Sequence, residues 1–457
     1  MFKKSKLSSF DLYVYGILIA FEILMSFTFL GYIHIAPISV AFAYIPVLIA
    51  GCFFGPLQST VMGIIFGLSS IYKSTAFYVL PSDMLFSPFL SGNPVGSLIL
   101  ALGTRTLFGY LTGVAFQAAK RQNNTKVKIG IISLLCPPFQ AFLVLAAMKL
   151  FFSDSVYVYL KSPYLVISNI ISAVVCIFIT QFLWEQYNGK SLKNLRNAIN
   201  ASKDIPYIDM KKKHVVVLAF SAFVFVMTIA AAVYFSNRMS YMLGMHDVVV
   251  SDEISVDLIQ LQIQFMGAMF SLNIISIMVM ALGYQYTAYT SFLGELDAVT
   301  GVMGRRIFLN CCEKSQKNND SQSSRSGWFL FLDIDRFKKI NDTMGHMVGD
   351  RVLKEIASLL KDKFYEYGIV GRMGGDEFAV MIDKKYLSED ELKKMLDDFL
   401  SGVSCILEPD FKVSCSIGAC WFSFPEEISL LMEKTDNLLY ESKQKGRACY
   451  TLGAYNM

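Results

Sequence analysis

The chain has 457 residues, of which 54% are hydrophobic and 17% charged, and its mean hydropathy is +0.45. This composition is too apolar for a wholly soluble protein, and the length suits two or three domains. The net charge of +4 gives no sign of a nucleic-acid partner, and we expect none.

Charge is distributed unevenly along the chain. Between residues 12 and 119 the only charged side chains are Glu22, Lys73, Asp83 and Arg105, whereas residues 297–457 are rich in charge. We therefore expect a membrane half followed by a soluble half.

A helix needs about 20 apolar residues to cross a bilayer. We predict about eight transmembrane helices, and the second is short enough to be tilted or partly re-entrant. Their expected ranges are 11–32, 38–54, 58–77, 95–118, 129–152, 163–183, 214–236 and 258–284.

Basic residues gather in three segments outside these spans: 1–6 before the first span, 120–128 after the fourth and 190–213 after the sixth. Because cytoplasmic loops carry an excess of Lys and Arg, we place these segments and both termini in the cytoplasm. The sequence therefore predicts a multi-pass protein of the cytoplasmic membrane. The nine cysteines show no zinc-ligand spacing, and we expect them to be reduced thiols.

The soluble half alternates strand and helix patterns around one hairpin, which indicates an α+β fold close to the ferredoxin-like arrangement. The expected strands are 328–334, 368–373, 378–382, 411–417, 419–422 and 448–451. The expected helices are 337–344, 349–366, 388–401 and 426–443, and the serine-rich segment 318–326 is expected to be a flexible insertion.

Two acidic clusters stand at strand ends in this half. Asp333-Ile334-Asp335 follows a buried apolar strand, and Asp376-Glu377 follows a glycine pair in a turn between two strands. Adjacent carboxylates repel one another, so a cation is their natural partner, and oxygen ligands suit Mg²⁺. Nearby lysines complete a pattern typical of metal-assisted phosphoryl or nucleotidyl transfer.

The sequence Gly-Gly-Asp-Glu-Phe at 374–378, with FLDIDRFKKINDTMGHMVGD at 331–350 ahead of it, resembles the GGDEF diguanylate cyclases. Three further pieces resemble motifs of that family in the same order: DAVTGVMGRR at 297–306, SIGAC at 416–420 and LYESKQKGR at 439–447. The resemblance covers 297–457 and implies a palm-type nucleotide cyclase that condenses two GTP to cyclic di-GMP and two pyrophosphates.

The resemblance also implies roles for the acidic clusters. Asp333 and Asp376 would hold Mg²⁺, with Mn²⁺ as an alternative, together with the main-chain carbonyl of Ile334 and with support from Glu377. Asp376 would also be the general base for the attacking 3′-hydroxyl, and Lys338 would stabilise charge on the reacting phosphate.

Five residues would bind the nucleotide according to the same resemblance. Asn341 and Asp350 would read the guanine edge, His346 would line the pocket, and Lys443 and Arg447 would hold the triphosphate. The family's product-inhibition motif R-x-x-D would fall on 365–368, where both its Arg and its Asp are absent. We therefore expect no product-inhibition site of the usual kind.

Residues 10–187 resemble the substrate-binding S component of energy-coupling-factor vitamin transporters. The resemblance is carried by HIAP at 34–37, IPVLIAGCFFGP at 45–56, GIIFGLSS at 63–70 and GTRTLFG at 103–109. Glycine motifs of this kind also serve close helix packing. A charge inside a span is costly, so Arg105 either belongs to a functional site or lies near a helix end and snorkels. Ligand-contact candidates on or near the outer loop after the third span are Ser69, Asp83, Ser91 and Asn93.

The predicted organisation has five parts. They are a six-helix ligand sensor at 1–187, a basic linker at 188–213, two spans with an outer loop at 214–284, a signalling helix at 285–296 and the cyclase domain at 297–457. The function we predict is a homodimeric, membrane-bound diguanylate cyclase regulated by a small, vitamin-like ligand. The alternatives are a catalytically inactive receptor for GTP or cyclic di-GMP and a vitamin-binding transporter subunit.

Overall fold

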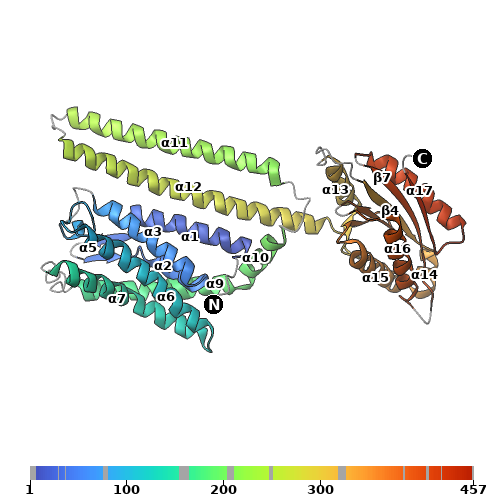
Figure 1. Ribbon diagram of the computed structural model, residues 1–457, viewed down its shortest axis with the longest axis horizontal. Coiled ribbons are helices and arrows are strands. Elements are labelled where there is room, and N and C mark those ends of the chain that lie inside the picture. Colours follow the sequence, from blue (N-terminus) through green and yellow to red (C-terminus); the bar gives the residue numbers. More distant parts are fainter. Residues whose placement is uncertain are drawn as a thin grey trace. The chain divides into compact units, whose positions relative to one another are not determined.

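The computed structural model describes residues 7–28, 30–35, 38–75, 81–153, 164–202, 210–245, 251–317, 326–383, 386–407, 411–423 and 425–454. The chain folds as two units, Met1–Tyr289 and Thr290–Met457, which we describe separately (Figure 1). The predicted insertion at 318–326 lies, except for its last residue, outside the described residues.

Among its described residues, the regular structure of the first unit is helical apart from one hairpin. Its helices are α1 (Ser9–Phe27), α2 (Ile45–Phe53), α3 (Pro56–Ser74), α4 (Pro81–Met84), α5 (Pro94–Leu98), α6 (Thr104–Lys120), α7 (Thr125–Phe151), α9 (Tyr164–Asn188), α10 (Lys190–Ser202), α11 (Met210–Met245) and α12 (Asp252–Gly294). A π-helical turn, η1 (Ile99–Gly103), joins α5 to α6.

Six described segments are helices long and apolar enough to cross a membrane. They are Ser9–Phe27, Pro94–Lys120, Thr125–Phe151, Val166–Asn188, Ala219–Met245 and Ile254–Gly294. The count of eight is therefore not confirmed, and the chain has a helical region with several apolar helices.

The predicted second span at 38–54 is wrong as a single helix. Strand β1 (Tyr32–Ile35) pairs with β2 (Ile38–Ala41), and only the nine residues of α2 that follow are helical. Nine helical residues rise about 14 Å, which is less than half of the roughly 30 Å hydrocarbon core. The third predicted span forms α3 but is not among these six helices.

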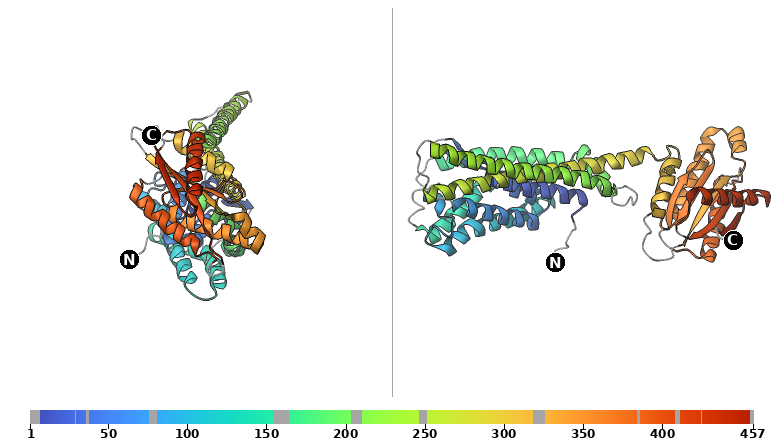
Figure 2. Two further views of the ribbon diagram at one scale, coloured as in Figure 1. Left: turned by 90° about the vertical axis from the view of Figure 1, so that its right-hand side faces the viewer. Right: turned by 90° about the horizontal axis from the view of Figure 1, so that it is seen from above.

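Helix α12 is unbroken over 43 residues (Figure 2) and contacts the rest of the first unit through polar and small residues. The Gln260 side chain donates to the main-chain oxygen of Tyr72 at 2.9 Å, and Gln285 donates to the Tyr13 hydroxyl at 2.8 Å. Between them Gly267 faces the ring of Phe27. These contacts tie α12 to α1 and α3.

The second unit is built on a six-stranded sheet in the order β3-β5-β6-β4-β7-β8. The strands are β3 (Met303–Gly304), β4 (Ser326–Ile334), β5 (Gly368–Arg372), β6 (Glu377–Ile382), β7 (Cys415–Ser423) and β8 (Tyr450–Ala454). The helices are α13 (Arg305–Lys317), α14 (Phe337–Met344), α15 (His346–Phe364), α16 (Glu389–Ser404) and α17 (Ile428–Gln444).

The four central strands β5, β6, β4 and β7 are antiparallel to one another, and the chain visits them in β-α-β-β-α-β succession. This is the predicted ferredoxin-like arrangement. The edge strands β3 and β8 run parallel to β5 and β7. Two expectations were wrong in detail: 411–417 and 419–422 are not two strands but the single strand β7, and helix α13 was not predicted.

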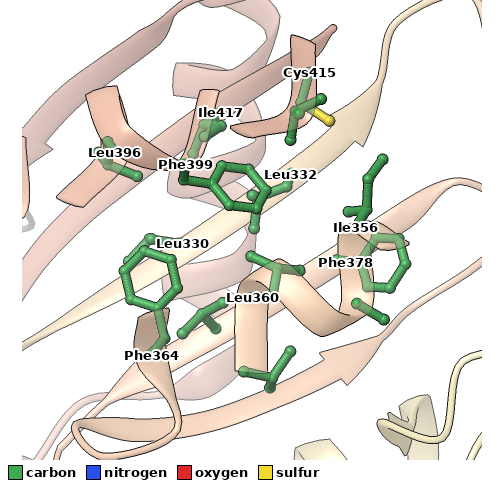
Figure 3. Packing of buried hydrophobic residues seen from close by; sticks show 14 of the residues in the cluster. Leu330, Leu332, Ile356, Leu360, Phe364, Phe378, Leu396, Phe399, Cys415 and Ile417 are labelled. Atoms are coloured by element: carbon green, nitrogen blue, oxygen red, sulfur yellow. The ribbon is translucent and has the colours of Figure 1, made fainter. Parts of the chain in front are cut away.

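Both faces of strand β4 are buried, as its continuous apolar sequence predicts. Leu330 and Leu332 point into a core shared with Phe364 of α15 and Phe399 of α16 (Figure 3). On the opposite face Phe329 packs against Phe308 of α13 with ring centroids 6.1 Å apart. This packing fixes the carboxyl end of β4, where the acidic cluster lies.

Candidate active site

The two acidic clusters meet at one end of the sheet. Asp333 on β4 stands directly opposite Glu377 on β6 in the antiparallel register. Strand β6 is joined to β5 by a turn at 373–376, closed by a hydrogen bond from the Met373 N–H to the Glu377 oxygen at 2.8 Å. The Ile334 N–H donates to the main-chain oxygen of Asp376 at 3.2 Å, which fixes the end of this turn against β4.

These carboxylates crowd one another electrostatically. Burial, with additional repulsion from Asp376 and Asp335, raises the pKa of Asp333, although Lys443 opposes the shift. Burial raises the pKa of Glu377 as well, and the charges of Asp333 and Asp376 add to the effect. The site therefore holds more negative charge than its surroundings compensate, and a bound cation would stabilise it.

Lys443, in the last turn of α17, supplies part of that compensation. Its Nζ lies 2.9 Å from Oδ2 of Asp333, and the two side chains are 32% and 15% exposed. The neighbouring Ser442 is buried and donates to the Ile417 oxygen at 2.8 Å, which holds the end of α17 on β7. The Lys443 ammonium group thus forms an ion pair with one carboxylate oxygen of the acidic cluster.

Arg372 holds the turn that carries Asp376, and sequence reasoning missed this role. Its guanidinium donates to the main-chain oxygens of Gly374 at 3.2 Å and Gly375 at 2.6 Å, and to Oδ1 of Asp297 at 2.9 Å. Burial raises the pKa of Asp297, but hydrogen bonds from Thr300 and Arg372 outweigh it and leave that pKa lowered. Arg372 thereby connects the motif at 297–306 to the turn at 373–376.

Asp335 is structural, although it belongs to the same acidic sequence as Asp333. It is buried and accepts hydrogen bonds from the hydroxyls of Ser414 and Ser416, both at 2.7 Å, and from the Ala448 N–H at 3.1 Å. The last of these stabilises a loop in which Arg447 and Ala448 have left-handed backbone angles, φ 68° and 51°. Asp335 is therefore saturated and positions the loop that carries Arg447.

The residues predicted to read guanine lie where α14 and α15 pack together. A side-chain atom on Gly349 would collide with the amide of Asn341, so the glycine permits this close approach. Asp350 follows Gly349 and is exposed, as is His346 one turn before it on the same face of α15. The structure thus packs Asn341 against Gly349, the residue before Asp350, in the first turn of α15.

Two predicted residues stand on exposed positions around this end of the sheet. Lys338 lies in the first turn of α14, directly after β4, and Arg447 lies in the loop after α17. The structure gives their placement on these elements, and their predicted contacts with phosphate remain predictions.

The donor set suits a hard divalent cation. Its side-chain donors are carboxylate oxygens on neighbouring strands, and the ammonium of Lys443 already shows that Asp333 accepts a positive charge. In the described part of the chain no three His, Cys, Asp or Glu side chains converge on a preformed metal position. The residues therefore fit Mg²⁺ by their chemistry, and Mn²⁺ by the same donors.

Position 365, where the product-inhibition motif has arginine, carries an exposed tyrosine. Tyr365 lines a pocket of about 350 Å³ with residues from the end of α12, the loop 301–303 and the end of α15. Lys361 closes one side of it by donating to the Gly301 oxygen at 2.8 Å. The absence of the usual product site stays a prediction from the sequence.

In the first unit, Arg105 is buried at 5% exposure in the first turn of α6. Ser69 is also buried. Ser91 and Asn93 have local roles: Asn93 caps α5 by accepting from Gly96 N–H at 3.0 Å, and Ser91 accepts from Ser97 at 2.6 Å. Two other residues predicted to contact a ligand, Asp83 in α4 and Arg105 in α6, come from separate elements.

Residues 295–449 match the family model described as diguanylate cyclase, GGDEF domain. The chain is 32% identical over 166 residues to diguanylate cyclase DgcS of Shewanella oneidensis, covering 35% of this chain and 54% of that protein. It is 31% identical over 161 residues to diguanylate cyclase DgcZ of Escherichia coli, covering 34% of this chain and 51% of that protein.

Among solved structures, the GGDEF domain of DgcB from Caulobacter crescentus in complex with c-di-GMP aligns with 26% identity and a TM-score of 0.32. It covers 35% of this chain and 95% of that one. The chain spans about half the length of the two curated relatives named above. The second unit thus contains a GGDEF domain, as the sequence predicted.

Proposed function

We propose that this protein is a membrane-bound diguanylate cyclase that condenses two GTP to cyclic di-GMP and two pyrophosphates. The observation that carries the proposal is the juxtaposition of Asp333, Asp376 and Glu377 at one sheet end, with Lys443 beside them. The curated relatives that share this domain are named as diguanylate cyclases, which supports the same reaction.

Asp333, Asp376 and Glu377, with the Ile334 carbonyl, would hold Mg²⁺, which supplies neutralisation of charge on the phosphates. Asp376 accepts the proton of the attacking 3′-hydroxyl as the new phosphodiester bond forms and pyrophosphate leaves. Lys338 offsets charge on the reacting phosphate, and Lys443 exchanges its contact with Asp333 for the triphosphate. Arg372 keeps the base in position by fixing the turn.

Residues of α14 and α15 would bind the guanine base. Asp350 can accept hydrogen bonds from the ring N–H and the amino group, and Asn341 is held beside it by Gly349. His346 lines the same surface, and Arg447 is placed to contact the triphosphate. A base that lacks the N–H and amino donors leaves Asp350 without partners, which favours GTP over ATP.

The reaction needs two GTP molecules facing each other, and one domain offers one nucleotide site. We infer an active homodimer with twofold symmetry. The apolar helices of the first unit support a location in the bacterial cytoplasmic membrane, and the GGDEF domain would lie on the cytoplasmic side, where GTP is present. The first unit would sense a small ligand and pass its state through α12.

The test is product identification. Purified full-length protein with GTP and Mg²⁺ should yield cyclic di-GMP and pyrophosphate in a 1:2 ratio, measured by mass spectrometry and a pyrophosphate-release assay. GTP that binds and is recovered unchanged would instead identify an inactive receptor.

A further inference from the structure

Helix α10 lies between the ends of two apolar helices of the first unit (Figure 1). It begins at Lys190, two residues after the apolar segment Val166–Asn188, and the chain bends between them at Gly189. Near the other end of α10, Asn200 accepts a hydrogen bond from the Phe10 N–H at 3.3 Å, in the first turn of α1. Both ends of α10 are therefore held at the same end of the helical bundle, where α9 ends and α1 begins.

One face of α10 packs against the bundle. Ile199 is buried on this face. The Arg196 guanidinium lies 4.2 Å from the centroid of the Tyr187 ring and 5.4 Å from that of the Phe10 ring. Its Nε atom lies 3.7 Å from Oδ1 of Asp11. These contacts fix the rotation of α10 about its own axis.

The opposite face of α10 is polar and basic. Lys190, Lys193, Asn194 and Asn197 are all exposed. Because residues three and four positions apart share one side of a helix, these four side chains form a single face. The packing of the other face therefore turns two ammonium groups away from the protein.

The acidic side chains near this end of the bundle are already paired. Asp11 contacts Arg196, and Glu185 in the last turns of α9 contacts Lys126 at the start of α7. Within the described ranges, neither of these ion pairs includes a lysine of α10, and Arg121 beyond the end of α6 is exposed as well. The described residues at this end of the bundle thus present an excess of positive charge.

The position of Lys190 relative to a bilayer follows from the apolar helix before it. Two residues of helix rise about 3 Å, and the headgroup layer on each side of the hydrocarbon core is about 5–8 Å thick. Lys190 therefore lies at the level of the lipid headgroups, with Lys193 on the same face of α10. A basic helix face directly after a membrane span has the charge that anionic phospholipids require of a protein surface.

We propose that the exposed face of α10 binds anionic phospholipids, with Lys190 and Lys193 contacting the phosphate groups. The inference rests on the membrane location in the proposed function and goes beyond it, because it names what this surface binds. Basic loops are common on the cytoplasmic side of membrane proteins, so the test compares lipids of different charge at this one surface.

The experiment uses the full-length protein in vesicles that mix phosphatidylglycerol, which is anionic, with phosphatidylcholine, which has no net charge. One of the two lipids carries bromine on its acyl chains and quenches nearby tryptophan fluorescence. Trp184 lies one turn before Asn188 and is the tryptophan of the first unit, since Trp328 and Trp421 belong to the second. Trp184→Phe supplies the background signal of the other two.

Half-maximal quenching should need at least about tenfold less brominated phosphatidylglycerol than brominated phosphatidylcholine at low ionic strength, since one basic residue at an anionic surface strengthens binding about fivefold. The double variant Lys190→Gln, Lys193→Gln should lose most of this preference. Lys190→Arg with Lys193→Arg keeps both charges and should keep the preference. Lys149→Gln removes an exposed lysine in the last turn of α7, at the opposite end of that helix from Lys126, and should change nothing.

Equal quenching by the two brominated lipids would overturn the proposal. A glutamine double variant that kept more than about half of the wild-type preference would overturn it as well. The substitutions alter exposed side chains, so Tm should match that of wild type and a folding defect does not confuse the comparison. Quenching of Trp184 by neither lipid would contradict the membrane location itself, which separates failure of the proposed function from failure of this inference.

Discussion

Replacing Arg372 with alanine should damage both stability and catalysis, because this side chain joins three parts of the domain. The variant loses the 2.9 Å contact with Asp297 and the two hydrogen bonds to the turn at Gly374 and Gly375. A hydrogen bond to a charged group contributes about 1.5–3 kcal/mol, and partial exposure of 14% and 23% reduces the ion-pair part. We expect a loss of about 2–4 kcal/mol, or about 5–10 °C in Tm.

The catalytic effect should fall on kcat. Without Arg372 the turn that carries Asp376 moves more freely, and a misplacement of about 1 Å can cost about 10²-fold in rate. KM for GTP should change little, since the guanine-binding residues lie on α14 and α15. The assays are thermal unfolding and initial rates of cyclic di-GMP formation by the full-length protein.

A matched control exists in the same domain. Arg306 contacts Glu295 at the same 2.9 Å distance, but the two side chains are 79% and 34% exposed. Arg306→Ala should therefore cost less than about 1 kcal/mol and leave turnover unchanged. Arg372→Lys keeps the charge without the planar fork and should recover only part of the loss. Equal effects of Arg372→Ala and Arg306→Ala would refute the reasoning.

The same contact predicts a pH effect. Because the pKa of Asp297 is lowered in the folded protein, its contribution to stability is present above its ordinary value of 3.8 and is lost as pH falls below it. Wild type should therefore lose more stability than Arg372→Ala between about pH 4 and pH 2. If the stability of wild type and Arg372→Ala fell equally with pH, Arg372 would not stabilise the ionised Asp297.

Three further predictions concern the active site. Glu377→Gln should raise Tm of the metal-free protein by about 1–2 °C at pH 7, because it relieves repulsion from the neighbouring carboxylates. This gain in Tm should vanish below about pH 4, where Glu377 is protonated in the wild type. Gly349→Ala should raise KM for GTP about tenfold by displacing Asn341. Gly402→Ala in α16, where the added atom meets only the flexible side chain of Leu359 from α15, should leave KM unchanged. Equal KM values would contradict this role of Gly349. Initial rates should be insensitive to micromolar cyclic di-GMP because Tyr365 replaces the arginine of the usual product site, and strong inhibition would disprove it.

Local patterns in the sequence predicted the strands and helices of the second unit well. The continuous apolar run before Asp333 predicted strand β4, and the glycine pair before Asp376 predicted the hairpin of β5 and β6. Both elements are observed. Gly418 misled the prediction, because we expected it to separate two strands. In the structure the backbone of α17 approaches Gly418, so the glycine serves helix packing within one strand.

Other features depended on contacts that no local pattern encodes. Arg372 and Asp297 are 75 positions apart, and nothing near either residue indicates the ion pair. Asp333 and Asp335 look alike in the sequence. Their partners distinguish them: Asp335 accepts from Ser414, Ser416 and Ala448, whereas Asp333 pairs with Lys443. In the first unit, residues 38–54 are apolar except for Ser39, and such runs cannot be assigned to strand or helix by periodicity alone.

The most direct test of the proposed chemistry is the rate of cyclic di-GMP formation by Asp376→Asn. This variant keeps size and fold but removes the proton acceptor and one carboxylate charge from the acidic cluster. Loss of a general base costs about 10²–10⁴-fold, so activity should fall near background while GTP binding persists in part. Asp398→Asn, on an exposed carboxylate paired with Lys363, should keep wild-type activity. If Asp376→Asn kept more than about a tenth of wild-type turnover, the assignment of catalysis to this hairpin would be contradicted.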